Sequence, residues 1–227
     1  GRAVFENIRK FLTYILSSNI PELVPYLAFV LFRIPLPLTI IQILAVDLGA
    51  DMLPALALGA EKPDPAVMQR PPRAPNERLL SWGLIARAYL FLGLLEAAAA
   101  MLAFFFVLDA AGWHYGQLLD RLDPVYLQAT SACLATIVVM QVINVFLCRH
   151  PRRSLLACGL GGNGYLWLGI VAELAVIALI LYTPSGNWLF GTAAFGGTTW
   201  LLAIACAALM CVLEELRKLS IRRTTGA

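Results

Sequence analysis

Two carboxylates lie inside a long apolar stretch of the sequence, where an ionised side chain is costly. Asp47 and Asp51 are four residues apart, so on a helix they share one face. Gly49 lies between them and Pro54 follows. A proline removes one helical hydrogen bond and clashes with the preceding turn, which predicts a bend or an unwound turn here. An ionised acid at the centre of a bilayer costs roughly 2.5–3.5 kcal/mol. Two acids on an interrupted helix therefore indicate a cation site with freed carbonyls as further ligands. The alternative is that the two acids are structural and are either protonated or ion-paired.

A second polar cluster lies just upstream in the preceding apolar segment. Asn19 and Glu22 are three residues apart and share a helical face, and Pro21 frees a backbone carbonyl near them. Only a short turn joins this segment to the one with Asp47 and Asp51, so we expect the two clusters to meet. Together they offer three carboxylates, an amide and loosened backbone, which are ligands that hard cations prefer. The same acids could instead hold protons, because packed acids favour their neutral form.

Further polar side chains lie within apolar segments farther along the chain. Gln141 and Asn144 share one helical face, and Glu173 lies in the next segment. They could extend the ion site or a proton path, and hydrogen bonding between helices is an equally good interpretation. We expect Glu96 to be structural, and we expect Arg87 to extend its charge to the membrane interface.

Other signals in the sequence do not indicate a site. His114 and His150 are isolated, and the five cysteines form no CxxC pair, so no transition-metal site is predicted. The glycine-rich stretch 159–164 does not follow a strand, and a flexible connector is the better interpretation. The basic residues of 149–153 are interpreted as a membrane-surface anchor, and no nucleic-acid partner is expected.

The composition places these residues in an integral membrane protein. Of 227 residues, 60% are hydrophobic and only 14% are charged, and the apolar residues form runs of bilayer-spanning length. We predict an all-α membrane protein, a single domain over residues 1–227 that forms a bundle of six transmembrane helices. The predicted helices cover residues 4–32, 38–58, 80–108, 127–147, 165–182 and 194–216.

The basic residues predict the orientation in the membrane. Six spans put both termini on one side, and of the 17 Lys and Arg only Arg33 and Arg121 fall on the other side. The positive-inside rule then places both termini in the cytoplasm. The chain begins with Gly1 rather than Met, and we expect it to be a piece of a longer polypeptide.

Several segments in order resemble the C-terminal membrane half of cation-transporting P-type ATPases. Residues 1–10 resemble the start of that family's fifth membrane helix, and 17–22 and 47–54 resemble its two main ion-binding stretches. Residues 68–73 resemble the loop between its sixth and seventh helices, and 214–223 resemble the end of its tenth. The amino-acid sequence of these segments is most similar to that of the sodium–potassium and proton–potassium pumps. The calcium pumps belong to the same group.

The resemblance implies a set of ion ligands. These are Ser18, Asn19, Glu22, Asp47 and Asp51, with a possible additional ion or proton site at Tyr14, Gln141, Asn144 and Glu173. Two positions depart from the family pattern. Ala50 replaces the usual Thr, and Asn144 replaces an acid that serves the third sodium site of the sodium pump. The departure at Asn144 favours a pump with a simpler stoichiometry.

The resemblance also implies what the rest of the protein supplies. The Asp-Lys-Thr-Gly-Thr phosphorylation motif is absent from this sequence, so this segment alone cannot hydrolyse ATP. ATP and Mg²⁺ are expected in the missing domains of the same polypeptide, and no cofactor is expected here. The implied function is to bind and translocate a cation (Na⁺/K⁺, Ca²⁺ or H⁺) across the plasma membrane. The alternative is a free-standing six-helix membrane protein that acts as a passive channel or an accessory subunit.

Overall fold

The computed structural model describes residues 2–62 and 78–225. The segment 68–73, which carries part of the family resemblance, lies outside the described residues, as do the charged residues between 63 and 77. The described residues form helices and connecting turns, without strands. Six helical segments are long and apolar enough to cross a membrane, which confirms the predicted fold class. They run over Arg2–Phe32, Ile40–Gly59, Trp82–Ala110, Pro124–Arg149, Gly164–Tyr182 and Gly197–Thr224.

The first span is interrupted at Asn19, between helices α1 (Arg2–Ser18) and α2 (Ile20–Phe32). The sequence predicts a disturbance here because Pro21 has no N–H group, so the carbonyl of Ser17 loses its usual helical partner. Helix α2 ends at Arg33, whose left-handed backbone (φ 51) lets its N–H bond to the carbonyl of Phe29. The proline-containing turn that follows leads back into the bundle.

The second span is interrupted in the stretch that carries Asp47 and Asp51. It consists of α3 (Ile40–Ala45), a π-helix η1 (Val46–Asp51) and α4 (Met52–Gly59). Pro54 cannot donate to the carbonyl of Ala50, and the wider π-helical turn lies directly before it. The predicted interruption is therefore present, as one widened turn within a continuous span.

The third span also contains a π-helix, which the sequence analysis does not predict. It consists of α5 (Trp82–Ile85), η3 (Ala86–Gly93) and α6 (Leu94–Ala110). The next span is a single helix, α7 (Pro124–Arg149), and α9 (Gly164–Tyr182) and α11 (Gly197–Thr225) form the last two spans. Two short helices, α8 (Leu155–Cys158) and α10 (Pro184–Phe190), lie in the connections. Helix α11 continues beyond its predicted end at Leu216, so the basic residues of the tail lie on a helix.

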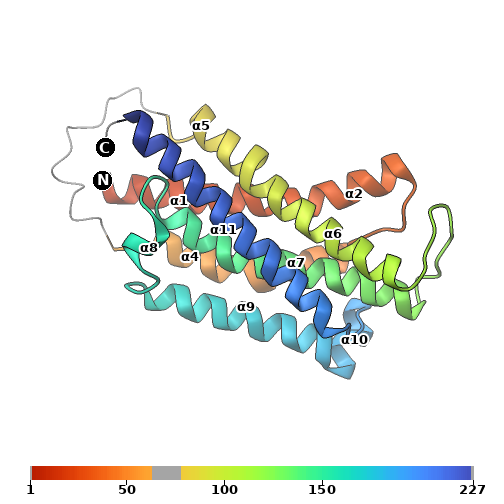
Figure 1. Ribbon diagram of the computed structural model, residues 1–227. Coiled ribbons are helices and arrows are strands. Elements are labelled where there is room, and N and C mark those ends of the chain that lie inside the picture. The colour runs from red at the N-terminus through yellow and green to blue at the C-terminus, as the bar shows by residue number, and fades with distance from the viewer. Residues whose placement is uncertain (1, 63–77, 226–227) are drawn as a thin grey trace.

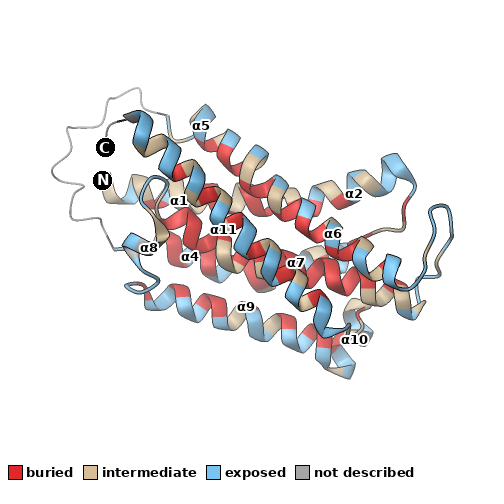
Figure 2. Ribbon diagram, in the orientation of Figure 1, coloured by how far each residue is buried: buried red, intermediate tan, exposed pale blue. Residues whose placement is uncertain are grey.

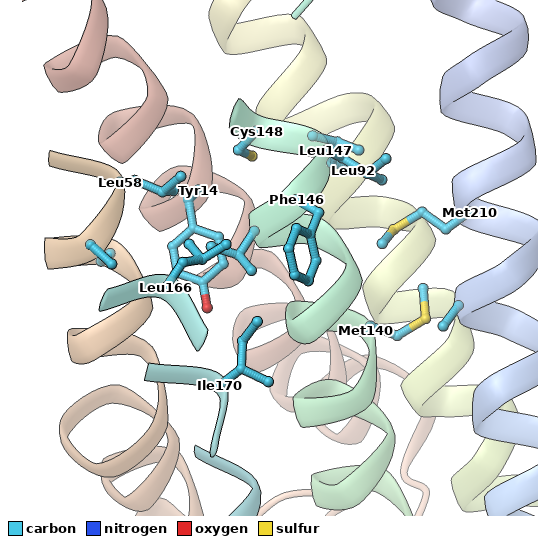
Figure 3. Packing of buried hydrophobic residues seen from close by; sticks show 14 of the residues in the cluster. Tyr14, Leu58, Leu92, Met140, Phe146, Leu147, Cys148, Leu166, Ile170 and Met210 are labelled. Carbon is cyan, nitrogen blue, oxygen red and sulfur yellow. The ribbon is translucent and has the colours of Figure 1, made fainter. Parts of the chain in front are cut away.

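Helix α7 is the centre of the bundle, and the other spans pack around it (Figure 1). Buried residues run along its whole length, whereas the outer helices are exposed on one face (Figure 2). Tyr14, Met140 and Phe146 belong to one apolar cluster with residues of α4, α9 and α11 (Figure 3). The exposed apolar side chains, such as Leu31, Leu168 and Leu201, lie on the outer surface that a bilayer would cover.

Candidate functional site

Asp51 is the central acid of the buried polar cluster. It closes the π-helix η1, and only 3% of its surface is exposed. The Tyr14 hydroxyl donates to its Oδ1 at 3.2 Å, and the Gln141 side-chain amide donates to its Oδ2 at 3.1 Å. Elements α1, η1 and α7 therefore meet at this one carboxylate.

Two more acids lie beside Asp51. Glu22 comes from the first turn of α2, is 8% exposed, and lies next to the carboxyl group of Asp47. Its Oε1 atom is buried and has no hydrogen-bond partner. The Ser18 side chain lies close to Asp51. The predicted meeting of the two clusters is thus present for Ser18, Glu22, Asp47 and Asp51.

Asn19 is not brought into this cluster. It lies at the break between α1 and α2, and its side chain is exposed on the surface of the bundle. The expectation that Asn19 and Glu22 share a face assumed a regular helix. The interruption at Asn19 changes the direction of its side chain, and Glu22 points inward.

The four residues of the possible additional site do not all bind the same group. Tyr14 and Gln141 bond Asp51, as described. Asn144 instead donates to the Ser17 hydroxyl at 2.6 Å and accepts from the Cys148 thiol at 3.3 Å. Glu173 is 1% exposed, and neither carboxylate oxygen has a hydrogen-bond partner. Helix α9 packs against η1, where a Cβ atom at Gly49 would stand 3.2 Å from Val176, so α9 also borders the cluster.

The cluster is rich in acceptors and poor in positive charge. Within residues 2–62 and 78–225, no ion pair joins Glu22, Asp47, Asp51 or Glu173 to a basic side chain. The prolines at 21, 25 and 54 also release the carbonyls of Ser17, Pro21 and Ala50 from their helical bonds. In the described part of the chain, no three acidic, His or Cys side chains converge closely enough to hold a metal ion by themselves. A cation bound here would be coordinated by neutral oxygens as well as by carboxylate oxygens.

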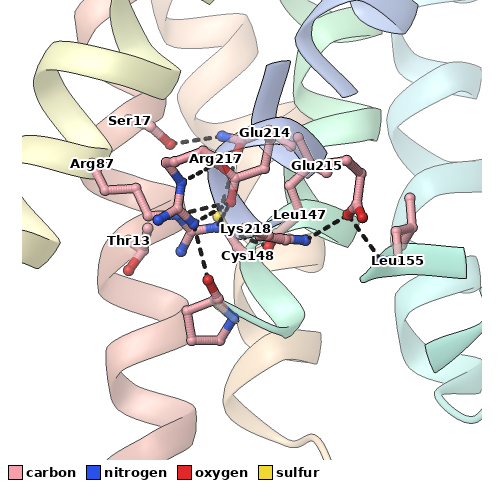
Figure 4. Close-up of polar contacts among 12 residues, drawn as sticks. Thr13, Ser17, Arg87, Leu147, Cys148, Leu155, Glu214, Glu215, Arg217 and Lys218 are labelled. Atoms are coloured by element: carbon pink, nitrogen blue, oxygen red, sulfur yellow. Dashed lines mark hydrogen bonds and ion pairs between the residues drawn. The ribbon is translucent and has the colours of Figure 1, made fainter. Parts of the chain in front are cut away.

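A separate ionic network ties the last helix to the bundle. The Arg87 guanidinium donates to Glu214 at 2.7 Å and to the Leu147 carbonyl at 2.9 Å, and Arg217 also donates to Glu214 (Figure 4). Lys218 is fully buried and pairs with Glu215 at 3.1 Å. The Arg87 side chain is therefore buried against a carboxylate of α11 and does not extend into solvent.

The basic cluster of 149–153 is only partly a surface feature. The Arg149 side chain is 5% exposed and pairs with Glu61 at 2.6 Å. Arg152 is exposed, as a surface anchor requires. Arg149 therefore joins the end of α7 to the end of the second span.

Two buried polar residues are not among the predicted site residues: Ser17, and Glu96, which the sequence analysis expects to be structural. Ser17 is 0% exposed and binds Asn144, and Glu96 is 0% exposed on α6. Burial of Ser17 could have been found from its position one turn after Tyr14, on the face that meets α7. No signal in the surrounding sequence indicates on which face Glu96 lies, because α6 is apolar all round.

The chain is similar in sequence to known cation-transporting proteins. Residues 35–220 match the family described as "Cation transporting ATPase, C-terminus". The sodium/potassium-transporting ATPase subunit alpha of Hydra vulgaris is 34% identical over 100% of this chain, and that of Drosophila melanogaster is 33% identical over 100%. Human subunit alpha-4 is 34% identical over 98%. In each case the match covers 24% of the relative, so the chain spans about a quarter of the length of these proteins. The chain therefore belongs to the cation-transporting P-type ATPases, as a multi-pass C-terminal membrane region of that family.

Proposed function

We propose that this region binds the transported cation between the interrupted first two spans, with Asp51 as the central ligand. The observation that carries the proposal is the set of contacts at Asp51. This carboxylate is buried within the bundle, and its hydrogen-bond donors are the neutral groups of Tyr14 and Gln141. Because neutral donors leave the negative charge uncompensated, a cation entering from solution would be stabilised there.

The further ligands we propose are Ser18, Glu22 and Asp47, with the freed carbonyls of Ser17 and Ala50. Discontinuous helices supply such backbone oxygens in transporters, and a buried site at one depth suits occlusion of the ion. Asn19 contributes through its side chain only if the break between α1 and α2 rearranges. The additional group of Tyr14, Gln141, Asn144 and Glu173 supports Asp51 or holds a proton.

We propose that the cation is monovalent. The relatives are named as sodium/potassium-transporting ATPases, and they match the whole chain at 33–34% identity. A divalent ion such as Ca²⁺ prefers several carboxylate oxygens at short distance, and the described acids do not converge in that way. Neutral oxygens and one or two carboxylates are the better match for a single charge.

We propose that ATP and Mg²⁺ act in other domains of the same polypeptide, which lies in the plasma membrane. The interrupted spans respond to those domains by changing the affinity and the access of the site. A widened π-turn next to Pro54 and a break beside Pro21 are places where such a change needs few hydrogen bonds to be broken.

The test is Asp51→Asn in the intact pump, measured as cation-stimulated ATP hydrolysis and phosphoenzyme turnover. We expect stimulation to fall at least about tenfold, because the central charge is lost. Asp109→Asn is the matched control, since Asp109 is exposed at the end of α6 and should leave turnover unchanged. Wild-type stimulation in Asp51→Asn, with normal amounts of folded protein, would refute the proposal.

A further inference from the structure

The connection between α9 and α11 differs from the neighbouring connection in its lack of charge. Residues 174–213 contain no Asp, Glu, Lys, Arg or His, so the facing ends of both spans and the whole connection between them are uncharged. The connection between α6 and α7 lies at the same end of the bundle, opposite the two termini, and carries Asp120, Arg121 and Asp123 (Figure 1). Charged side chains are typical of segments that water surrounds. The uncharged connection therefore indicates a less polar environment.

Helix α10 exposes large apolar side chains from this connection. Trp188 is 84% exposed and Leu189 is 52% exposed. They continue the outer surface of the bundle, where Leu179 near the end of α9 and Leu201 near the start of α11 are also exposed. A bilayer covers that surface along the spans, so α10 extends the same apolar surface at their ends.

Aromatic side chains lie at the level where the two spans end. The indole of Trp200 donates to the Tyr182 hydroxyl at 2.9 Å, which joins the start of α11 to the end of α9. Helix α9 has 19 residues and is therefore about 28 Å long, close to the thickness of the hydrocarbon core. Trp and Tyr are enriched where hydrocarbon meets the lipid headgroups, because each combines an apolar ring with a polar group. Tyr182, Trp188 and Trp200 have this composition at this level.

Helix α10 is packed tightly against the end of α9. The Thr183 hydroxyl accepts from the Gly186 N–H at 3.0 Å and begins the helix. A Cβ atom at Gly186 would collide with the carbonyl oxygens of Leu179 and Ile180, so the backbone of α10 lies directly on the backbone of α9. The position of α10 along the axis of α9 is therefore fixed.

The second span is also joined to α10. The Gln42 side chain on α3 is fully buried and donates to the Phe190 carbonyl at 3.1 Å and to the Gly191 carbonyl at 3.3 Å. Gln42 lies one helical turn from the π-helix η1, on the span that carries Asp47 and Asp51. The depth that α10 takes in the membrane therefore also sets the depth of this span.

We propose that α10 lies in the interface between the lipid headgroups and the hydrocarbon, at the end of the bundle opposite the termini, with Trp188 and Leu189 inserted into phospholipid. The partner is the bilayer itself. Because the connection carries no basic residue, the contact depends on apolar and aromatic surface and does not require anionic lipid. The inference goes beyond the proposed function and does not rest on it, since it needs only that the six spans cross a membrane.

The first measurement is labelling of the intact pump with a water-soluble maleimide, in open membrane fragments where both faces are accessible. Trp188→Cys and Leu189→Cys should react at least about tenfold more slowly than Leu118→Cys, because a thiol in apolar surroundings keeps its proton and is unreactive. Leu118 is the matched control, since it is 96% exposed in the charged connection at the same end. The unsubstituted pump gives the background from native cysteines. Equal rates at positions 188 and 118 would place α10 in water and overturn the proposal.

The second measurement identifies what covers Trp188. The wild-type pump and Trp188→Phe are reconstituted in phosphatidylcholine that carries bromine on its acyl chains, which quenches tryptophan fluorescence on contact. The signal lost in Trp188→Phe belongs to Trp188, and bromine near the headgroup should quench it more than bromine near the end of the chain. Slow labelling without this quenching would mean that another protein segment covers Trp188, and the proposal would fail. It would fail equally if bromine near the chain end quenched more strongly, or if quenching needed added phosphatidylserine.

Discussion

Asp51 shows how single residues determine the character of the cluster. A basic partner would neutralise this carboxylate permanently, and a cation would then bind it weakly. Tyr14 and Gln141 hold the side chain in place through its two oxygens without cancelling its charge. Orientation by neutral donors is the arrangement that a reversible cation ligand requires.

The hydrogen bond from Tyr14 to Asp51 can be measured by a double-mutant cycle. Tyr14→Phe removes the donor and should destabilise the protein by about 1.5–3 kcal/mol, the range for bonds to a charged group. The same change in an Asp51→Ala background should cost much less, because the acceptor is already gone. The measurement is the thermal midpoint of each variant in detergent.

Tyr165→Phe is the control for this cycle, since Tyr165 is 70% exposed and its substitution should leave the midpoint unchanged. Equal effects of Tyr14→Phe in both backgrounds would show that the hydroxyl contributes nothing through Asp51.

At the scale of elements, glycines decide how closely the helices approach. Gly169 on α9 lies against the backbone of α4, where an added Cβ atom would stand 2.9 Å from the Pro54 nitrogen. Pro54 follows the π-turn that carries Asp51. This contact therefore also fixes the position of Asp51 along the axis of α9. Gly93 has the same function between the third span and the break in the first.

Gly169→Ala should therefore destabilise the bundle, although alanine is the better helix former by about 1 kcal/mol. The backbone atoms that the new methyl group meets cannot move aside, and overpacking of this kind typically costs about 1–3 kcal/mol. Gly164→Ala at the start of the same helix meets no atom within 4 Å and should be neutral or stabilising. Thermal midpoints of the two variants in detergent test the difference, and a midpoint for Gly169→Ala at or above the wild type would contradict it.

The whole molecule has one end that is held together by buried charge. Arg87 with Glu214 and Arg149 with Glu61 join four spans, and Lys218 with Glu215 forms a further pair within α11. The start of α1 and the last turns of α11 lie at this same end (Figure 1). This distribution of basic residues supports our proposal that this end faces the cytoplasm.

Cysteine labelling of the intact pump in cells tests this orientation. Leu118 is 96% exposed in the connection between α6 and α7, and Arg152 is exposed after the other end of α7. A membrane-impermeant maleimide should label Leu118→Cys in intact cells and should label Arg152→Cys only after permeabilisation. The unsubstituted protein gives the background from its native cysteines. The opposite pattern of labelling would reverse the proposed orientation.

By itself the sequence determines the six spans and the positions where two of them are interrupted. Length and apolarity fix the spans, because a bilayer requires about 20 apolar residues. Pro21 and Pro54 fix the interruptions, because a missing N–H acts locally and does not depend on the neighbouring helices. The meeting of Glu22, Asp47 and Asp51 follows from the short turn that joins these two spans.

Only the tertiary structure decides which polar side chains meet across distant spans. Glu96 is buried on α6, Asn19 is exposed, Asn144 binds Ser17, and Arg87 binds Glu214 more than a hundred residues away. A membrane helix that is apolar on every face carries no periodic pattern to show its inner side. Its rotation is set by close packing, at contacts such as those of Gly93 and Gly169, and by the pairing of buried charges.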